Sequence, residues 1–191
     1  LVSDIPSLKK AGYVGIDNRS AGRLAGLLMG RFLHPDKTHK VVIVIGSLSY
    51  RGHEEREMGF KSILSQEFRN LTISEIVEVS DDRDRAYSEI RRILADEPPS
   101  AIYNIGSGNQ GIAQALKEAN LARDTIFIAH DLTGATKAML LDRTLDAIID
   151  QNPRVEAREA INLLASAVRG SSEPQYPPRL QVVFAENIPS L

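Results

Sequence analysis

Short apolar runs of strand length alternate along most of the chain with longer segments in which apolar residues recur at helical spacing. The runs are KVVIVIG, ISEIVEVS, AIYNI, TIFIAHD and LDAIID, and helix-period segments such as EEREMGFKSILSQEF and DRDRAYSEIRRILADE separate them. KVVIVIG is almost continuously apolar, as expected for a strand that is buried on both faces. From Val41 onward the pattern therefore predicts an α/β fold with a doubly wound parallel sheet.

Further elements flank this series. YVGI at 13–16 predicts a short strand, and the stretch from Ser20 to about Leu33 predicts a helix for which Asp17 or Asn18 supplies the cap. HPDKTHK is a polar connector and a candidate boundary between two lobes. After the series, Pro153 and Gly170 suit the first turn and the stop of one more helix, and LQVVFAE predicts a final strand.

Polar residues or glycines follow the predicted strands. In parallel sheets ligands bind just beyond the carboxyl ends of the strands, so these residues should line one rim. The rim would contain Asn104, Gly106, Asn109, Asp131 and Gln151. A function is therefore expected at this edge of the sheet.

Composition excludes several classes of function. The chain has 191 residues, 42% hydrophobic and 25% charged, which is typical of a globular protein. Its net charge of −2 leaves no excess of basic residues to neutralise phosphates, so nucleic acid is not an expected partner of this segment. No apolar run approaches the roughly 20 residues of a membrane span. The chain starts at Leu1 without a signal-peptide pattern, and we expect that a segment upstream has been removed.

One motif suggests a dinucleotide site. Gly106, Gly108 and Gly111 form a G-x-G-x-x-G between a strand and a helix, and Asp131 ends the next strand. An NAD-dependent oxidoreductase that uses the loop Gly106–Gly111 is therefore one hypothesis. The motif lies in the third strand-helix unit of the series, whereas a dinucleotide fingerprint normally lies in the first. The other hypothesis is a small polar ligand held by the strand-end residues.

Catalytic and metal sites have weaker support. His53 and the glutamates that follow it resemble H-E-x-x-H, but position 57 is Glu57 where a second His is required. Acidic residues favour the start of a helix, which explains this cluster without a metal. His130, inside a predicted strand, is expected to be a packed histidine. We expect a protein that is not an enzyme and has no cofactor.

A sugar fits the rim better than these chemistries do. Sugar hydroxyls both donate and accept hydrogen bonds, carboxylates accept them, guanidinium groups donate them and amides do both. Arg56, Asp131, Gln151 and an asparagine at 104 or 109 would together supply all of these groups.

The chain resembles the sugar-binding domains of the lactose-repressor family of transcriptional regulators and the related periplasmic ribose-binding proteins. The matching segments, in family order, are GIDNRSAGRLAGLLMGRFL, VVIVIGSLSYRGHEEREMGFKSIL, AIYNIGSGNQGIAQAL, IFIAHDLTGATKAM and LDAIIDQNP. The resemblance implies that Arg56 contacts the sugar, that Asp131 accepts hydroxyl protons and that Gln151 follows the last crossing strand as a further contact.

The resemblance leaves some contacts open. Either Asn104 or Asn109 would take the family's asparagine role. Arg83 stands where relatives place a ring that stacks on the sugar, which suggests an acidic or phosphorylated sugar or a polyol. Ser3 would be a remnant of the other half of the cleft.

The resemblance also implies two lobes and a regulatory role. Residues 1–36 and 152–174 would form part of an N-terminal lobe, and residues 38–150 and 178–191 the C-terminal lobe. The implied protein is a cytoplasmic, homodimeric effector-binding domain, whose regulator contacts DNA only through a helix-turn-helix outside this sequence. The alternative is a periplasmic sugar receptor of a transport system.

Overall fold

The computed structural model describes residue 4, residues 9–170 and residues 178–189. The predicted alternation of strands and helices is present in it. In chain order the elements are α1 (Asn18–Phe32), β1 (His39–Ile45), α2 (Arg51–Glu67), β2 (Leu71–Glu78), α3 (Arg83–Asp96), β3 (Ala101–Asn104), α4 (Asn109–Glu118), β4 (Ile126–His130), α5 (Gly134–Leu141), β5 (Ala147–Asp150), α6 (Pro153–Arg169), β6 (Gln181–Val183) and a 3-10 turn (Ala185–Asn187).

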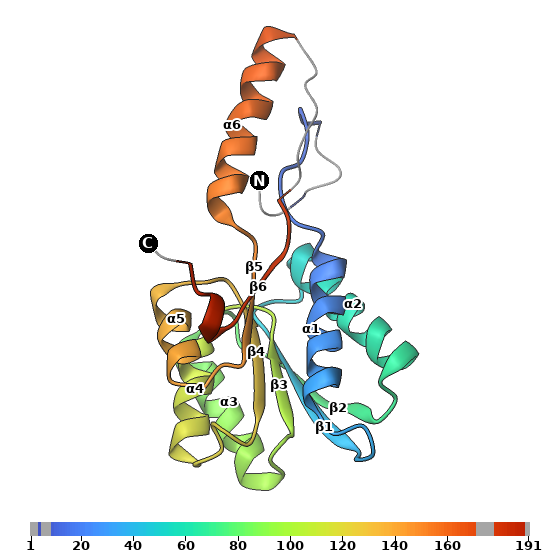
Figure 1. Cartoon of the computed structure of the whole chain (residues 1–191), viewed down its shortest axis with the longest axis vertical. Helices are drawn as coiled ribbons and strands as arrows, with labels where there is room; N and C mark the ends of the chain where they lie inside the picture. Colours follow the sequence, from blue (N-terminus) through green and yellow to red (C-terminus); the bar gives the residue numbers. More distant parts are fainter. Residues whose placement is uncertain (1–3, 5–8, 171–177, 190–191) are drawn as a thin grey trace.

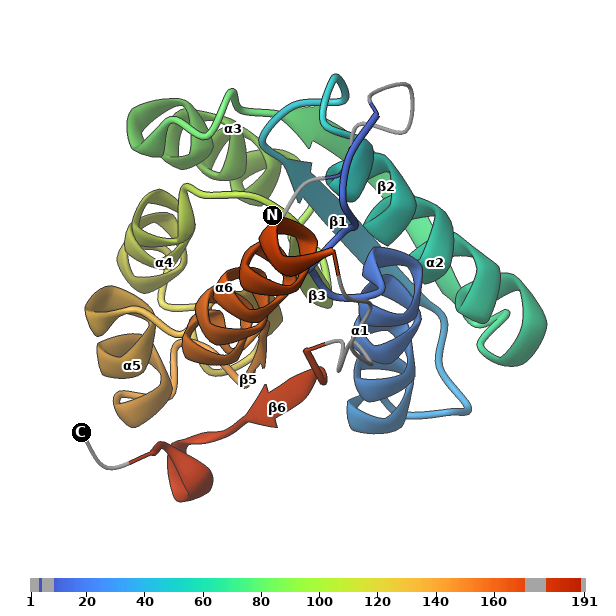
Figure 2. The same ribbon diagram turned by 90° about the horizontal axis from the view of Figure 1, so that it is seen from above.

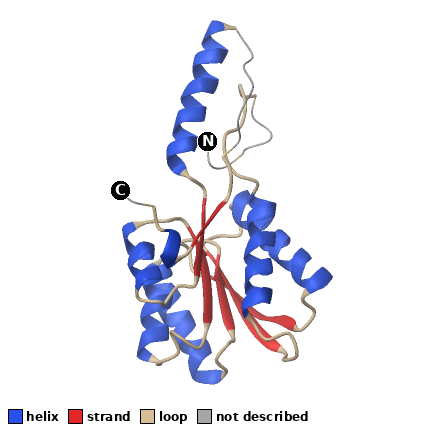
Figure 3. Ribbon diagram, in the orientation of Figure 1, coloured by secondary structure: helices blue, strands red, loops and turns tan. Residues whose placement is uncertain are grey.

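The strands form one sheet in the order β2-β1-β3-β4-β5-β6 (Figure 1; strands are red in Figure 3). All neighbours are parallel except β6, which runs antiparallel to β5 with Ile148 opposite Val183. The first strand of the series lies inside the sheet, and the chain winds outward from it in both directions. This arrangement confirms the predicted α/β fold, and it brings the carboxyl ends of β1 to β5 to one edge.

Helices cover both faces of the sheet. α1 and α2 lie on one face and α3, α4 and α5 on the other, which the view from above makes plain (Figure 2). Alternate residues of β1 point to opposite faces. Ile43 packs with Met29 and Phe60 beneath α1 and α2. Val44 packs with Ile90 of α3 in the core of the other face. This alternation explains why β1 is apolar from Val41 to Ile45.

Helix α1 differs from the predicted lobe assignment. We expected residues 1–36 to belong to the N-terminal lobe, but α1 packs against α2 and contributes Ala25 and Met29 to the core beneath the sheet. Glycines allow this close approach, because a Cβ on Gly22 would lie 1.8 Å from the backbone oxygen of Arg56. Asn18–Phe32 is therefore part of the same lobe as the sheet.

The predicted strand at 13–16 was wrong. Tyr13 to Ile16 has no strand assignment, although Val14 and Ile16 are buried. Ile16 joins the core beneath α1 instead of entering a ladder. Burial alone produced the apolar pattern at this position.

Helix α6 stands apart from the sheet. It rises beyond the carboxyl end of β5, away from the other helices (Figure 1). Asn152 caps it in the left-handed region (φ 55°), Pro153 opens it, and Gly170 ends it at φ 68°. Among residue 4, residues 9–170 and residues 178–189, no helix combines the length and apolar character that a bilayer crossing requires.

Candidate functional site

A polar cavity of about 240 Å³ opens at the carboxyl edge of the sheet. Loops that follow β1, β2, β3, β4 and β5 reach it, together with the first turns of α1 and α2. Three of the predicted contact residues line it, namely Arg56, Asp131 and Gln151. The cavity therefore lies at the edge where parallel sheets bind their ligands.

Arg56 is held rigidly in the cavity wall. Its side chain is buried, with 6% of the residue exposed. Nε donates to Oδ1 of Asn18 over 2.8 Å, and Nη1 donates to the backbone oxygen of Ile105 over 3.1 Å. These bonds fix the plane of the guanidinium, so that its charge keeps one orientation toward the cavity.

Asp131 and Gln151 form a hydrogen-bonded pair. Asp131 follows β4 and Gln151 follows β5. Nε2 of Gln151 donates to Oδ1 of Asp131 over 2.7 Å. Asp131 has a left-handed backbone (φ 67°), which an Asp tolerates better than most residues. Thr136 Oγ1 donates to its backbone oxygen over 2.8 Å and holds this turn. The carboxylate is thus aimed at the cavity by its own backbone.

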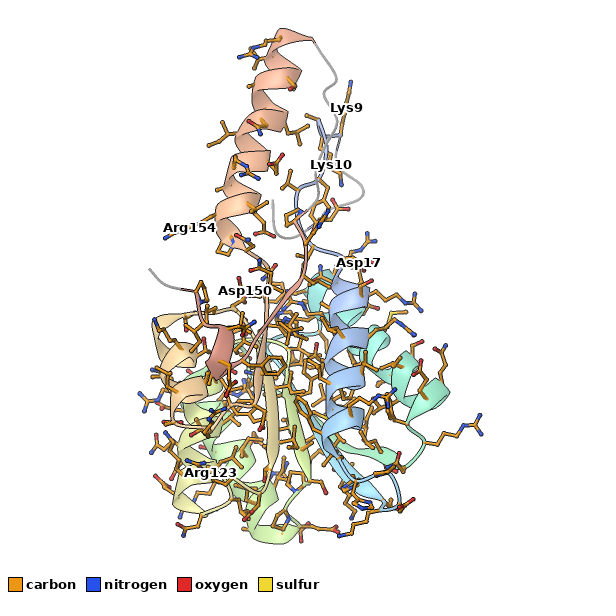
Figure 4. The ribbon with its side chains drawn as sticks, viewed as in Figure 1. Lys9, Lys10, Asp17, Arg123, Asp150 and Arg154 are labelled. Carbon is orange, nitrogen blue, oxygen red and sulfur yellow. The ribbon has the colours of Figure 1, made fainter. Side chains whose placement is uncertain are left out.

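Asp150 ties these two residues to α6. Its Oδ1 accepts from the backbone N–H of Leu132 over 2.9 Å, and its Oδ2 accepts from that of Asn152 over 3.0 Å. Figure 4 shows Asp150 at the junction between the sheet and α6. One carboxylate therefore connects the loop after β4 to the start of α6.

His53 adds a neutral ring to the lining. Its Nδ1 accepts from the backbone N–H of Ser47 over 3.3 Å, so the ring proton of the neutral form lies on Nε2. Burial and the charge of Arg56 lower the pKa of His53 below 6.5. Tyr50 contacts the ring edge-on, with 5.3 Å between centroids. The sequence pattern had pointed to a solvated helix start at this position.

Asp81 also lines the cavity, although it was not among the contact residues predicted from the sequence. Its Oδ1 accepts from the backbone N–H of Ser107 over 2.7 Å. Its backbone is left-handed (φ 56°), like that of Ser80 before it (φ 53°). The sequence held one signal for Asp81. It is a polar residue in a loop after a predicted strand, two places before Arg83, which was an expected contact.

The predicted asparagines support the wall without lining the cavity. Nδ2 of Asn104 donates to Oδ1 of Asn109 over 2.7 Å and to the backbone oxygen of Ser107 over 2.9 Å. Asn104 is fully buried. Both side chains therefore shape the loop after β3, which carries Ser107 to the cavity.

Arg83 is also not found at the cavity. Arg83 is exposed at the start of α3, and its Nη2 donates to Oε1 of Gln114 on α4 over 3.1 Å. The Arg83 side chain therefore points toward α4, which packs against α3. Ser3 lies outside the described residues.

A buried pair lies beneath the cavity floor. Tyr103 is fully buried and its hydroxyl lies 2.8 Å from Nε2 of His130. Burial and the charge of Arg56 hold the pKa of His130 well below 6.5. Tyr103 also stacks on Phe60 of α2, with 4.7 Å between ring centroids. His130 is the packed histidine that the sequence predicted.

The sequence matches the family described as "Periplasmic binding protein domain" over residues 1–172. The chain belongs to this family. No curated protein matches it significantly in sequence.

Solved structures of this family type are similar to the chain over nearly its whole length. GanP, described as a glucose-galactose binding protein from Geobacillus stearothermophilus, superposes with a TM-score of 0.90 at 25% identity, over 99% of this chain and 68% of that one. A solute-binding protein of an ABC transporter from Burkholderia graminis C4D1M, in complex with D-arabinose, gives 0.88 at 24%, over 97% and 65%. One from Actinobacillus succinogenes 130z, with bound D-allose, gives 0.82 at 21%, over 92% and 61%. This chain thus spans about two thirds of the length of each.

In this periplasmic binding protein domain, the space next to the glycines of the G-x-G-x-x-G motif is occupied by other residues of the chain. A Cβ on Gly106 would lie 2.5 Å from Oδ1 of Asp81, and one on Gly111 would lie 2.1 Å from the backbone oxygen of Arg83. In a dinucleotide fingerprint the glycines make room for pyrophosphate and for helix packing. Here the carboxylate of Asp81 lies next to the loop and accepts the hydrogen bond of the Ser107 N–H. The loop therefore does not suit an anionic ligand.

Proposed function

We propose that this chain binds a sugar in the cavity at the carboxyl edge of the sheet, as part of the receptor of a sugar-uptake system. It holds the ligand without converting it. The observation that carries the proposal is the convergence of the fixed guanidinium of Arg56 with the Asp131–Gln151 pair on one cavity.

The chemistry of these groups suits a polyol. Arg56 donates to hydroxyl oxygens, Asp131 accepts hydroxyl protons, and the amide of Gln151 can do both. The Gln151 bond engages Oδ1 of Asp131 and orients Oδ2 for a ligand hydroxyl. Hydrogen bonds to charged groups each contribute about 1.5–3 kcal/mol, so two such groups give useful affinity.

The similar structures support a receptor. GanP is named for binding glucose and galactose, and two further relatives carry D-arabinose and D-allose in complexes of transporter components. Because this chain spans about two thirds of their length, the activity of a whole receptor is part of the proposal. These similarities favour the receptor over the regulator that the sequence motifs suggested.

The second candidate is the effector domain of a lactose-repressor-type regulator. The ordered set of shared motifs supports it. In that case the protein would act in the cytoplasm as a homodimer, with DNA contacted by a helix-turn-helix outside this sequence. Sedimentation of the natural full-length protein at micromolar concentration separates the candidates, because a dimer favours the regulator and a monomer favours the receptor.

The test of sugar binding uses titration calorimetry on the natural full-length protein. The probes are D-glucose, D-galactose, D-arabinose and D-allose. We expect at least one to bind, and Asp131→Ala and Arg56→Ala each to weaken it roughly 10- to 100-fold. Arg83→Ala is the control, because Arg83 is exposed on the helical face. Absence of binding by all four sugars, or unchanged affinity in both cavity variants, would overturn the proposal.

A further inference from the structure

Asp81 lines the cavity next to the carboxyl ends of the neighbouring strands β1 and β3. A Cβ on Gly46, directly after β1, would lie 2.0 Å from Oδ1 of Asp81 and 2.7 Å from Oδ2. A Cβ on Gly106, just after β3, would lie 2.5 Å from Oδ1. Only glycines at both strand ends leave room for the carboxylate. The loop after β2 therefore places a negative charge where the two strands open into the cavity.

The backbone around Asp81 is shaped to hold this position. Ser80 and Asp81 are consecutive non-glycine residues with positive φ, 53° and 56°. Such conformations cost energy and persist where surrounding contacts enforce them. Two contacts hold this turn: the 2.7 Å hydrogen bond from the N–H of Ser107 to Oδ1 of Asp81, and the bond from Nη1 of Arg85 to Oγ of Ser80. The carboxylate of Asp81 is thereby fixed in the wall of the cavity.

The basic residues next to Asp81 in the sequence do not compensate its charge at the cavity. Arg83 bonds to Gln114 on the helical face. Arg85 bonds to Ser80 Oγ over 2.9 Å and to the backbone oxygen of Glu78 over 3.2 Å. Among the described lining residues, Asp81 and Asp131 are acidic and Arg56 alone is basic, while the lowered pKa keeps His53 neutral at pH 7.

We propose that Asp81 is a specificity-determining residue that excludes sugar acids and sugar phosphates, so that the cavity takes a neutral or amino sugar. The proposal rests on the proposed sugar-binding function. It replaces the expectation of an acidic ligand, which depended on Arg83 lying at the rim. A carboxylate brought beside Asp81 meets a like charge in a half-enclosed site, where one unit charge at short range changes affinity by about tenfold or more.

The test compares matched sugars in wild type and Asp81→Asn. The probes are D-glucose with D-glucuronate and D-glucosamine, and D-galactose with D-galacturonate and D-galactosamine. In the wild type we expect the neutral or amino sugar to bind at least tenfold more tightly than the uronate. In Asp81→Asn we expect that ratio to fall by about tenfold. Asn retains an acceptor for the N–H of Ser107 and tolerates the left-handed backbone, so the variant should fold.

Asp84→Asn is the matched control. It removes the same charge three residues further on, from an exposed position in the first turn of α3. We expect it to leave the ratio of affinities unchanged. Preference for the uronate in wild type, or an equal change in both variants, would overturn the role of Asp81 while leaving sugar binding intact. Absence of binding by every neutral and amino sugar would instead count against the proposed function.

A second measurement needs no ligand. The negative charge of Asp81 raises the pKa of His53 against the larger effects of burial and Arg56. We expect Asp81→Asn to lower the pKa of His53, followed by NMR titration of its ring protons, and Asp84→Asn to leave it unchanged. An unchanged pKa in Asp81→Asn would show that its charge does not reach the cavity, which would refute the proposal even if no sugar in the panel binds.

Discussion

Asn18 accepts a 2.8 Å hydrogen bond from Nε of Arg56, although 38 residues separate them in the chain. Asn18 is the first residue of α1 and is buried, with 6% exposed. Asn18 itself lines the cavity, and the contact joins α1 to α2 at the cavity wall. The position of the guanidinium therefore depends on how closely the two helices pack, as well as on the loops that surround the ligand.

Asn18→Ala should weaken sugar binding without unfolding the protein. The change leaves Nε of Arg56 without its acceptor in a buried wall, and the guanidinium loses one of its two fixed bonds. We expect affinity to fall by about five- to tenfold, equivalent to about 1 kcal/mol. Calorimetry measures the change. Asn18→Asp keeps an acceptor at the same place and should retain most of the affinity; equal losses in both variants would contradict the positioning role.

Gly22→Ala should destabilise the lobe and disturb the site together. A Cβ at this position would lie 1.8 Å from the backbone oxygen of Arg56, so α1 must move away from α2. Overpacking of this kind costs about 1–3 kcal/mol in the free energy of unfolding. Urea denaturation measures the loss. Gly134→Ala is the control, because a Cβ there meets nothing within 4 Å; a loss of similar size in the control would contradict the packing argument.

The succession of strands and helices and the doubly wound fold could be predicted because each strand carries its own pattern. β1 is apolar from Val41 to Ile45 since both faces are covered there, and β5 ends at Asp150, directly before Gln151, where the sheet meets the cavity. The side of the sheet that α1 covers could not be predicted. That choice depends on the fit of Gly22 against α2, and a contact between distant residues leaves no periodic signal.

The site also contains residues that could be predicted from the sequence and residues that could not. Arg56, Asp131 and Gln151 were predictable because they directly follow strands or face inward from a helix start. Arg83 was expected at the rim, and Asp81, two residues earlier, lines the cavity instead. Ser80 and Asp81 both have left-handed backbones, and this turn precedes the start of α3 at Arg83. Backbone reversal at non-glycine residues is not visible in the sequence.

The protein should lose stability as the pH falls below about 6.5. His130 has a pKa well below 6.5 in the folded state, because it is buried and lies near Arg56. As the pH falls below 6.5, His130 becomes protonated in the unfolded chain but stays neutral in the folded protein. The free energy of unfolding then falls by up to about 1.4 kcal/mol for each pH unit. His53, whose pKa is also lowered, adds to the effect.

Urea denaturation between pH 7.5 and 5 measures this slope. We expect His130→Gln to lose less stability over that range than the wild type, since Gln does not titrate and can still bond to the Tyr103 hydroxyl. His34→Gln, at an exposed position, is the control and should keep the wild-type slope. Identical slopes in the wild type and His130→Gln would show that His130 does not carry the effect.

Glu156, in the first turn of α6, should lower the free energy of unfolding, and a single substitution at this position should raise it. It is 3% exposed, and within the part of the chain that the structure describes its Oε1 has no hydrogen-bond partner. Burial raises the pKa of Glu156 above 4.5, and the nearby carboxylates of Asp131 and Asp150 raise it further. The folded protein therefore binds this proton more tightly than the unfolded chain does. As the pH rises through the window from 4.5 to the folded pKa, stability is lost, and the penalty is complete above it.

Glu156→Gln keeps the shape of the side chain and removes the charge. We expect the free energy of unfolding at pH 7.5 to rise by about 1 kcal/mol, because an unpaired buried charge is costly. At pH 4, where the carboxyl is mostly protonated in both states, the difference between the two proteins should be much smaller. Glu67→Gln, at an exposed position near the end of α2, should change stability by less than about 0.5 kcal/mol at either pH. A stabilisation of the same size at pH 4 and pH 7.5 would mean that packing and not charge is responsible, and a loss at pH 7.5 would mean that the Glu156 carboxylate is stabilised in the folded protein.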